Sequence, residues 1–381
     1  MVSISPNPIA VDQSALDDLR ERLARTRWPE REAVDDWSQG IPLAYVQSLC
    51  EHWANSYDWR RVEAELNRFE QLRFTTTVGA PDDLGIQVLH APSPHADAVP
   101  LVLTHGWPGS VVEFLDVVEP LRDPTRHGGD AADAFHVVCP TMPGYGFSDK
   151  PTRTGWGVER IADAWAELMT ALGYERFGAQ GGDWGSAVTS AIAVQHPDRC
   201  LGIHLNMVSV RPGRDEPTEA EQRAIARLDD HRKWGVGYST QQATRPQTLG
   251  YGLVDSPAAQ AAWIVEKFWA WADHGGVPDD AVSLDRLLDN VMHYWLPGAG
   301  ASSGRLYWES FNRFRRSEAI SVPAAMSIFP KEIFTPSRRW AEESFTDIRH
   351  WNELDRGGHF AAFEQPQLFV DEVRAAFRTM R

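Results

Sequence analysis

The sequence Gly181-Gly182-Asp183-Trp184-Gly185 stands directly between a predicted strand, residues 177–179, and a predicted helix, residues 184–196. A sharp turn from strand into helix brings the two backbones close together, so it needs small residues around its central residue. Gly181 and Gly185 meet that need. The central Asp183 then stands exposed at the strand end, where its side chain can act as a nucleophile. The alternative is a glycine-rich turn in which Asp183 caps the helix.

Short apolar runs alternate with helical patterns on both sides of this turn. The runs cover residues 86–89, 101–104, 135–139, 202–205, 322–328 and 347–351, and helical patterns begin after Ser110, at Val158 and at Pro366. Continuous apolar strands that alternate with helices are typical of a mostly parallel sheet covered by helices on both faces. We therefore expect an α/β fold.

Two regions lack strands and look helical instead. Residues 1 to about 78 show helical periodicity, with helix starts predicted at Ser14, near Pro42 and after Asp58. A linker at residues 212–217 introduces four further helical patterns, two of which begin at Ser256-Pro257 and at Ser283. The expected parts are an N-terminal helical meander (1–95), the first part of the α/β core (96–210), a helical cap (211–320) and the second part of the core (321–381).

The loop His105-Gly106-Trp107-Pro108-Gly109 ends the apolar run at residues 101–104. A loop in this place can aim the backbone N–H of Trp107 at the space above Asp183, and the N–H of Trp184 can point there too. Two such donors would form an oxyanion hole, worth roughly 3 kcal/mol for each donor in a transition state. The alternative is an ordinary Gly/Pro turn. We expect the His105 side chain to be structural.

A histidine and a carboxylate near the C-terminus fit the order nucleophile, acid, base. His359 lies in a glycine-flanked loop after the last predicted strand, where it can serve as a base. Glu332 follows the strand at residues 322–328, at a strand end that carries function in such sheets. Glu353 and Asp355 are rivals for the acid, but they lie on the histidine loop itself. We expect Glu332 to orient His359.

The composition, and the absence of several motifs, argue against some classes of binding partner and cofactor. The chain has 53 acidic and 37 basic residues, a net charge of −16, which argues against nucleic acids, anionic substrates and anionic membrane surfaces. Its three cysteines form no CxxC pair, and no apolar run is long enough to span a membrane. No signal peptide is visible, so we expect a cytoplasmic protein. The sequence has no metal-ligand cluster, GxGxxG fingerprint or P-loop, so we expect neither metal nor cofactor.

Five segments together resemble the epoxide hydrolases of the microsomal type. They are residues 105–110 (HGWPGS), 143–148 (PGYGFS), 181–185 (GGDWG), 330–336 (PKEIFTP) and 356–364 (RGGHFAAFE), and the resemblance extends over nearly the whole chain. It implies an α/β-hydrolase fold with an inserted helical cap and an N-terminal meander. It also implies roles for five residues: Asp183 as nucleophile, Glu332 as acid, His359 as base, and Tyr238 and Tyr307 of the cap as proton donors.

The resemblance implies that the protein converts a neutral epoxide to a vicinal diol through an aspartyl ester, which His-activated water then hydrolyses. The sixteen tryptophans, many of them in the expected cap, suggest a large apolar pocket and hence a bulky or aromatic epoxide, although such residues are more often part of a core. The partners would be the epoxide and water, and a homodimer is one option. Detoxification and secondary metabolism both fit. One alternative is a haloalkane dehalogenase, with Trp184 as the halide ligand, although that reaction needs neither paired phenols nor a long N-terminal meander. The other is a non-catalytic α/β-hydrolase that binds a ligand or partner.

Overall fold

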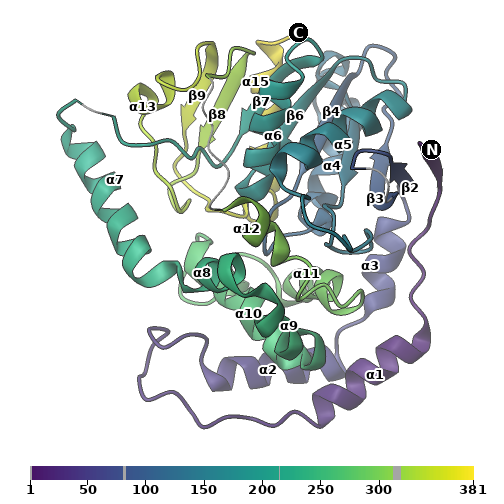
Figure 1. Cartoon of the computed structure of the whole chain (residues 1–381), viewed down its shortest axis with the longest axis vertical. Helices are drawn as coiled ribbons and strands as arrows, with labels where there is room; N and C mark the ends of the chain where they lie inside the picture. The colour runs from purple at the N-terminus through teal and green to yellow at the C-terminus, as the bar shows by residue number, and fades with distance from the viewer. Residues whose placement is uncertain (1, 80–82, 214, 312–318) are drawn as a thin grey trace.

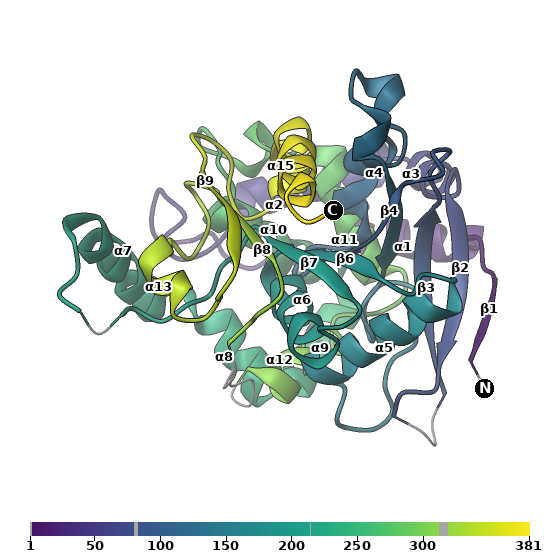
Figure 2. The ribbon, with the colours of Figure 1, turned by 90° about the horizontal axis from the view of Figure 1, so that it is seen from above.

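The computed structural model describes residues 2–79, 83–213, 215–311 and 319–381. Within them, one nine-stranded sheet has the order β1-β2-β3-β5-β4-β6-β7-β8-β9 (Figures 1 and 2). The strands are β1 (Ser3–Pro6), β2 (Glu70–Thr76), β3 (Leu84–Ala91), β4 (Val99–Thr104), β5 (Phe135–Pro140), β6 (Phe177–Gly181), β7 (Cys200–Leu205), β8 (Ala324–Ile328) and β9 (Ile348–Glu353). From β5 through β4 to β9 all pairs are parallel, whereas β1, β2, β3 and β5 pair antiparallel. The expectation of a mostly parallel sheet is confirmed.

Helices cover both faces of this sheet. Figure 2 shows α4 (Leu115–Arg122) and α15 (Pro366–Arg378) on one face, and α5 (Val158–Ala171) and α6 (Asp183–Gln195) on the other. Both faces are therefore removed from water, which explains why the central strands are continuously apolar rather than alternating. In β4, for example, Leu101, Val102 and Leu103 are all fully buried.

A group of helices separates β7 from β8 in the chain. It comprises α7 (Glu219–Asp230), α8 (Gly237–Thr244), α9 (Pro246–Asp255), α10 (Pro257–Trp271), α11 (Leu284–Trp295) and α12 (Arg305–Ser310). The described residues between β7 and β8 thus contain six α-helices where four patterns were expected, because α8 and α12 are too short to show a clear period. The predicted caps Ser256 and Ser283 are confirmed, since each hydroxyl accepts a backbone N–H of its helix.

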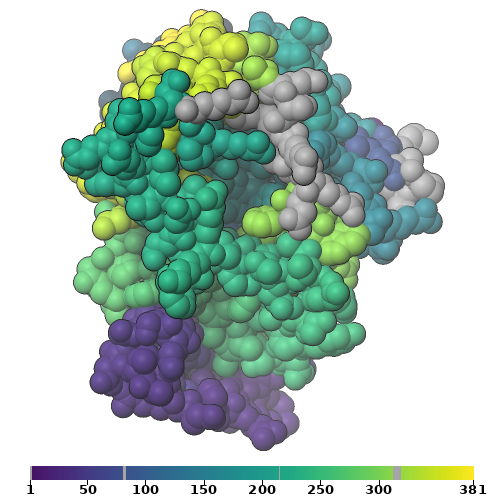
Figure 3. All heavy atoms as spheres, turned by 60° about the vertical axis from the view of Figure 1, so that its left-hand side comes forward, coloured from purple at the N-terminus to yellow at the C-terminus, as the bar shows by residue number. Residues whose placement is uncertain are grey.

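The N-terminal residues form α1 (Gln13–Ala24), α2 (Leu43–Asn55) and α3 (Trp59–Leu66), which pack with these helices below the sheet (Figures 1 and 3). The helix starts at Pro42 and Asp58 are confirmed. The start at Ser14 is wrong, because α1 begins at Gln13 and Ser14 lies inside its first turn.

The expectation that residues 1 to about 78 are helical is also wrong at two places. Strand β1 lies near the N-terminus, and β2 pairs with β3 along its whole length. Helical periodicity in a short segment cannot exclude a strand whose hydrogen bonds are made to a partner elsewhere in the chain. The division of the chain into parts at residues 95, 210 and 320 stays a prediction. No helix in the described ranges is both long and apolar enough to cross a membrane.

A buried ion cluster joins α3, α11 and α4. Asp289 of α11 is fully buried, and its carboxylate accepts hydrogen bonds from Arg61 at 2.6 Å and from the hydroxyl of Tyr57 at 2.9 Å. Arg286, one turn earlier, binds Glu65 of α3 at 2.8 Å and Asp116 of α4 at 3.0 Å. The cluster therefore joins the N-terminal helix α3 to α11, between β7 and β8, and to α4, which covers one face of the sheet.

Asp289→Asn should destabilise the protein by about 3 kcal/mol, because Arg61 and the Tyr57 hydroxyl lose the fully buried carboxylate to which they donate. The matched control is Asp285→Asn on the same helix, whose carboxylate is 47% exposed and pairs with His52. This control should cost under about 1 kcal/mol. Urea unfolding of both variants measures the difference, and equal losses would show that the cluster contributes no more than a surface pair.

Candidate active site

The turn between β6 and α6 places Asp183 in a strained backbone conformation. Asp183 has a φ of +50°, the left-handed region that a non-glycine residue rarely adopts. The turn is also crowded, because a methyl group on Gly185 would lie 1.8 Å from the carbonyl oxygen of Thr104. A methyl group on Gly181 would lie 2.1 Å from the carbonyl oxygen of Gly185. The sharp turn predicted from these glycines is therefore present.

The Asp183 carboxylate faces the loop after β4 rather than its own helix. Its Oδ1 atom accepts a hydrogen bond of 2.8 Å from the backbone N–H of Trp107. The residue at the N-cap position of α6 is Gly182, so the alternative that Asp183 caps the helix is wrong. Gly106 leaves room for this contact, since a methyl group there would lie 2.3 Å from Cβ of Asp183. Trp184 follows in the first turn of α6, and its backbone N–H as a second donor stays a prediction.

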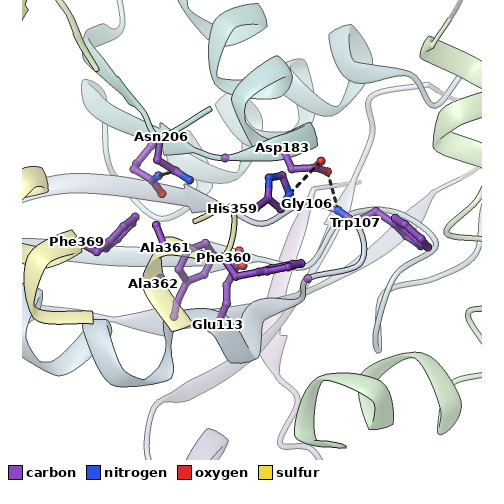
Figure 4. Close-up of a pocket in the computed structure, with 14 residues that line it drawn as sticks. Gly106, Trp107, Glu113, Asp183, Asn206, His359, Phe360, Ala361, Ala362 and Phe369 are labelled. Carbon is purple, nitrogen blue, oxygen red and sulfur yellow. Dashed lines mark hydrogen bonds and ion pairs between the residues drawn. The ribbon is translucent and has the colours of Figure 1, made fainter. Parts of the chain in front are cut away.

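His359 lies between Asp183 and Glu332, and Figure 4 shows its ring beside Asp183. Its Nε2 atom is 3.4 Å from Oδ2 of Asp183, and its Nδ1 atom is 2.8 Å from Oε1 of Glu332. All three come from the carboxyl ends of strands, since they follow β6, β8 and β9 in the chain. The structure thus brings together the three residues that the sequence singled out. The rival acids Glu353 and Asp355 are exposed to solvent.

The two carboxylates decide the protonation of His359. Burial alone would lower the pKa of the imidazole, but the charge of Glu332 and the hydrogen bond and charge of Asp183 raise it well above the ordinary value. His359 therefore carries a proton while both carboxylates are ionised. Both of its ring nitrogens then donate, Nδ1 to Glu332 and Nε2 toward Asp183.

Aromatic side chains close the space above Asp183. The ring of Tyr238 stacks on Trp107 with centroids 5.1 Å apart, and Tyr307 meets Trp184 edge to face at 4.9 Å. The rings of Tyr238 and Tyr307 meet edge to face with centroids 5.9 Å apart. Burial and then the charge of Asp183 raise the pKa of Tyr238, while burial and the charges of Tyr238 and Asp183 raise that of Tyr307. Both phenols thus lie within the field of Asp183, and both keep their protons at neutral pH.

His105 plays a different part from His359. Its Nδ1 atom lies 3.0 Å from the carbonyl oxygen of Gly106, and its Nε2 atom accepts the backbone N–H of Met142 at 3.2 Å. Burial lowers the pKa of His105 to about 4, so the ring is neutral and holds two loops together. The structural role expected for it agrees with these contacts. The described residues contain no group of three or more His, Cys, Asp or Glu side chains that could hold a metal ion.

Comparison with known proteins agrees with this geometry. Residues 4–114 match the family described as "Epoxide hydrolase N terminus", and residues 99–244 match "alpha/beta hydrolase fold". The chain is 54% identical over 99% of its length to a Stigmatella aurantiaca protein named "Putative epoxide hydrolase", covering 86% of that protein. It is 31% identical to "Epoxide hydrolase 1" of Sus scrofa, covering 98% of this chain and 88% of the relative. The solved structure of Aspergillus niger epoxide hydrolase superposes with a TM-score of 0.88 at 31% identity, covering 100% of this chain and 97% of that one.

The chain belongs to the epoxide hydrolases of the microsomal type. Its α/β-hydrolase fold is confirmed as well, and the family favours epoxide hydrolysis over the dehalogenase and the non-catalytic alternatives.

Sequence reasoning missed two residues next to the reaction centre of this epoxide hydrolase. The ring of Trp271 lies 5.0 Å from that of His359 and 5.1 Å from that of Tyr238, so it packs against both. From the sequence, Trp271 was only one of several cap tryptophans that suggested either an apolar pocket or core packing, and nothing placed it next to His359. The second residue, Glu113, lines a cavity beside Asp183 and His359. In the sequence, Glu113 stands three residues after Ser110, as in a helix capping box. That pattern already accounted for a glutamate at this position, so no other role was considered.

Gly185→Ala should prevent this epoxide hydrolase from folding or destabilise it by several kcal/mol, because the added methyl group meets the Thr104 carbonyl of β4. Gly252→Ala is the matched control, since α9 leaves open space around that glycine. The control should be neutral or gain up to about 1 kcal/mol from the better helix propensity of alanine. Soluble yield and thermal melting check both, and a fully stable Gly185→Ala would contradict the crowded turn.

Proposed function

We propose that this epoxide hydrolase opens a neutral epoxide by nucleophilic attack of Asp183 and then hydrolyses the resulting ester with water activated by His359. The observation that carries the proposal is the position of the Asp183 carboxylate. It lies 3.4 Å from the His359 ring that Glu332 holds, and its charge acts on the two buried phenols Tyr238 and Tyr307. A carboxylate so placed can attack carbon while a phenol supplies the proton for the leaving oxygen.

In the first step an Asp183 oxygen forms a bond to an epoxide carbon, and the bond from that carbon to the epoxide oxygen breaks. The oxygen leaves as an alkoxide and takes a proton from Tyr238 or Tyr307. Because both phenols are protonated at neutral pH, they can donate as the charge develops. The product of this step is a hydroxyalkyl ester on Asp183.

In the second step water attacks Cγ of Asp183 and gives a proton to His359. Formation of the ester prepares His359 for this task, because it removes the negative charge and the hydrogen bond by which Asp183 raises the pKa of His359. The imidazolium then loses its proton, which reprotonates the phenolate left by the first step, and the neutral imidazole becomes the base while Glu332 continues to orient it. We assign stabilisation of the oxyanion to the backbone N–H groups of Trp107 and Trp184, and the 2.8 Å hydrogen bond from Trp107 to Asp183 supports this role for the first of them.

The surroundings favour an uncharged substrate with a bulky or aromatic group. The ring of Trp107 lies 5.1 Å from that of Tyr238, 6.4 Å from that of Trp263 and 6.5 Å from that of Trp271, and the rings of Trp271 and Tyr238 are 5.1 Å apart. Such a lining removes apolar surface from water and offers rings for edge-to-face contacts. The carboxylate of Asp183 and the net charge of −16 disfavour an anion.

The double variant Tyr238→Phe, Tyr307→Phe should slow ester formation about 100-fold or more, because no phenol remains to protonate the alkoxide. Each single variant should lose less, since one donor stays. Tyr251→Phe is the control, because this tyrosine is 72% exposed on α9. Stopped-flow kinetics with styrene oxide measures the rate. Full activity of the double variant would contradict the role of the phenols.

His359→Gln should consume about one equivalent of styrene oxide and then stall, because Asp183 needs no base for its attack but water does. Intact-mass and peptide analysis should find the substrate's mass on the peptide that bears Asp183. Asp183→Asn should form no fast adduct. Steady diol production by an unmodified His359→Gln enzyme would instead make Asp183 a base for direct attack by water.

A further inference from the structure

A small cavity lies beside the reaction centre. About 20 Å³ of it is open to the centre of a water molecule, which is enough for one or two waters. Its wall includes Asp183, His359, Gly106 and Glu113. Neither of the two phenols is among the described residues that line it.

The cavity is polar as well as small. Gln180 at the end of β6 is 1% exposed, and its Nε2 atom donates to Oδ1 of Asn206 at 2.8 Å. Its Oε1 atom has no hydrogen-bond partner among the described residues, and both side chains line the cavity. A buried acceptor without a hydrogen bond lowers the stability of the folded protein, unless a water molecule reaches it and donates one. The cavity therefore offers a water molecule the two or more polar partners that it needs.

Glu113 is held in the wall by the loop that follows β4. It belongs to η1 (Val111–Phe114), the short helix that Ser110 caps by accepting the N–H of Val112. A methyl group on Gly109 would lie 2.9 Å from Oε2 of Glu113, so the glycine makes room for the carboxyl group. Figure 4 shows the carboxyl end of Glu113 directed into the cavity, on the same side as Phe360 and His359.

We propose that this cavity holds the water that hydrolyses the Asp183 ester, and that Glu113 is a further catalytic residue that binds and orients this water. The proposal rests on the ester mechanism proposed above. The carbonyl oxygen of the Glu113 acid accepts one hydrogen bond from the water, and Nε2 of His359 accepts the proton that is transferred. The water oxygen forms a bond to Cγ of Asp183, the ester bond breaks, and the imidazolium returns its proton to the leaving diol oxygen.

Glu113 acts in its neutral form. Burial raises the pKa of Glu113 to about 8, the proton on His359 opposes this shift and the charge of Asp183 adds to it. The other titratable groups that Glu113 faces are Cys139 of β5 and Tyr294 of α11, and burial keeps both neutral. An ionised Glu113 would add negative charge beside the developing oxyanion and hold the proton on His359. Hydrolysis of the ester should therefore slow as the pH rises and Glu113 loses its proton.

Two substitutions separate this role from a structural one. Glu113→Gln keeps a neutral side chain of the same shape with a carbonyl acceptor, whereas Glu113→Leu keeps the bulk and removes both polar atoms. Glu119→Gln, on the outer side of α4 where Glu119 pairs with Arg122, is the matched control. Each is mixed with excess styrene oxide and quenched, and the rates of ester formation and ester hydrolysis are followed by intact mass.

Glu113→Leu should form the ester at the wild-type rate but hydrolyse it about 10- to 100-fold more slowly, so that the ester accumulates. Glu113→Gln should hydrolyse it within about threefold of wild type and lose the decline at alkaline pH, and Glu119→Gln should match wild type throughout. Wild-type hydrolysis in Glu113→Leu, or equal slowing of both steps, would overturn the role of Glu113. If His359→Gln also carries no ester on Asp183, the ester mechanism itself is wrong, and that result is distinct from the other two.

Discussion

The close approach of the β6–α6 turn to β4 is the constraint on which the rest of the site depends. Gly185 nearly touches the Thr104 carbonyl, and Gly106 nearly touches the side chain of Asp183. These contacts hold Asp183 in a conformation that costs free energy, of order 1–3 kcal/mol. This cost is offset by the stability of the surrounding core, in which helices cover both faces of the sheet. Without the strained turn the carboxylate would not reach the N–H of Trp107 or the ring of His359.

The protonation states of His359 and of the two phenols depend on the charge of the neighbouring carboxylates. His359 is protonated because two carboxylates face it, and the phenols keep their protons because they are buried near one of those carboxylates. All of these groups respond to whether Asp183 is ionised. A covalent change at Asp183 would therefore alter the pKa of the His359 imidazole and the pKa values of the phenols together. This coupling needs neither a metal ion nor a movement of the backbone.

Much of this arrangement could be predicted from the sequence, for identifiable reasons. Glycines at both sides of Asp183 are a local requirement of the turn, and Glu332 and His359 each follow a strand in a sheet whose strand ends gather on one edge. Strands β1 and β2 could not be predicted, because their pairing depends on partners far away in the chain. Glu113 and Trp271 were missed because a capping pattern and an apolar helix already explain their residue types. What they contact follows only from the packing of separate elements.

The order of the strands also affects how the protein behaves beside other copies of itself. Strand β2 pairs over seven residues with β3, and its other side is covered by the four residues of β1. Strand β1 is short and ends in Pro6, which has no N–H to offer, while the opposite edge strand β9 exposes Arg349 and Glu353. Both outer edges thus resist the addition of another strand. Loss of the first few residues would uncover β2, a longer edge, and would favour edge-to-edge aggregation.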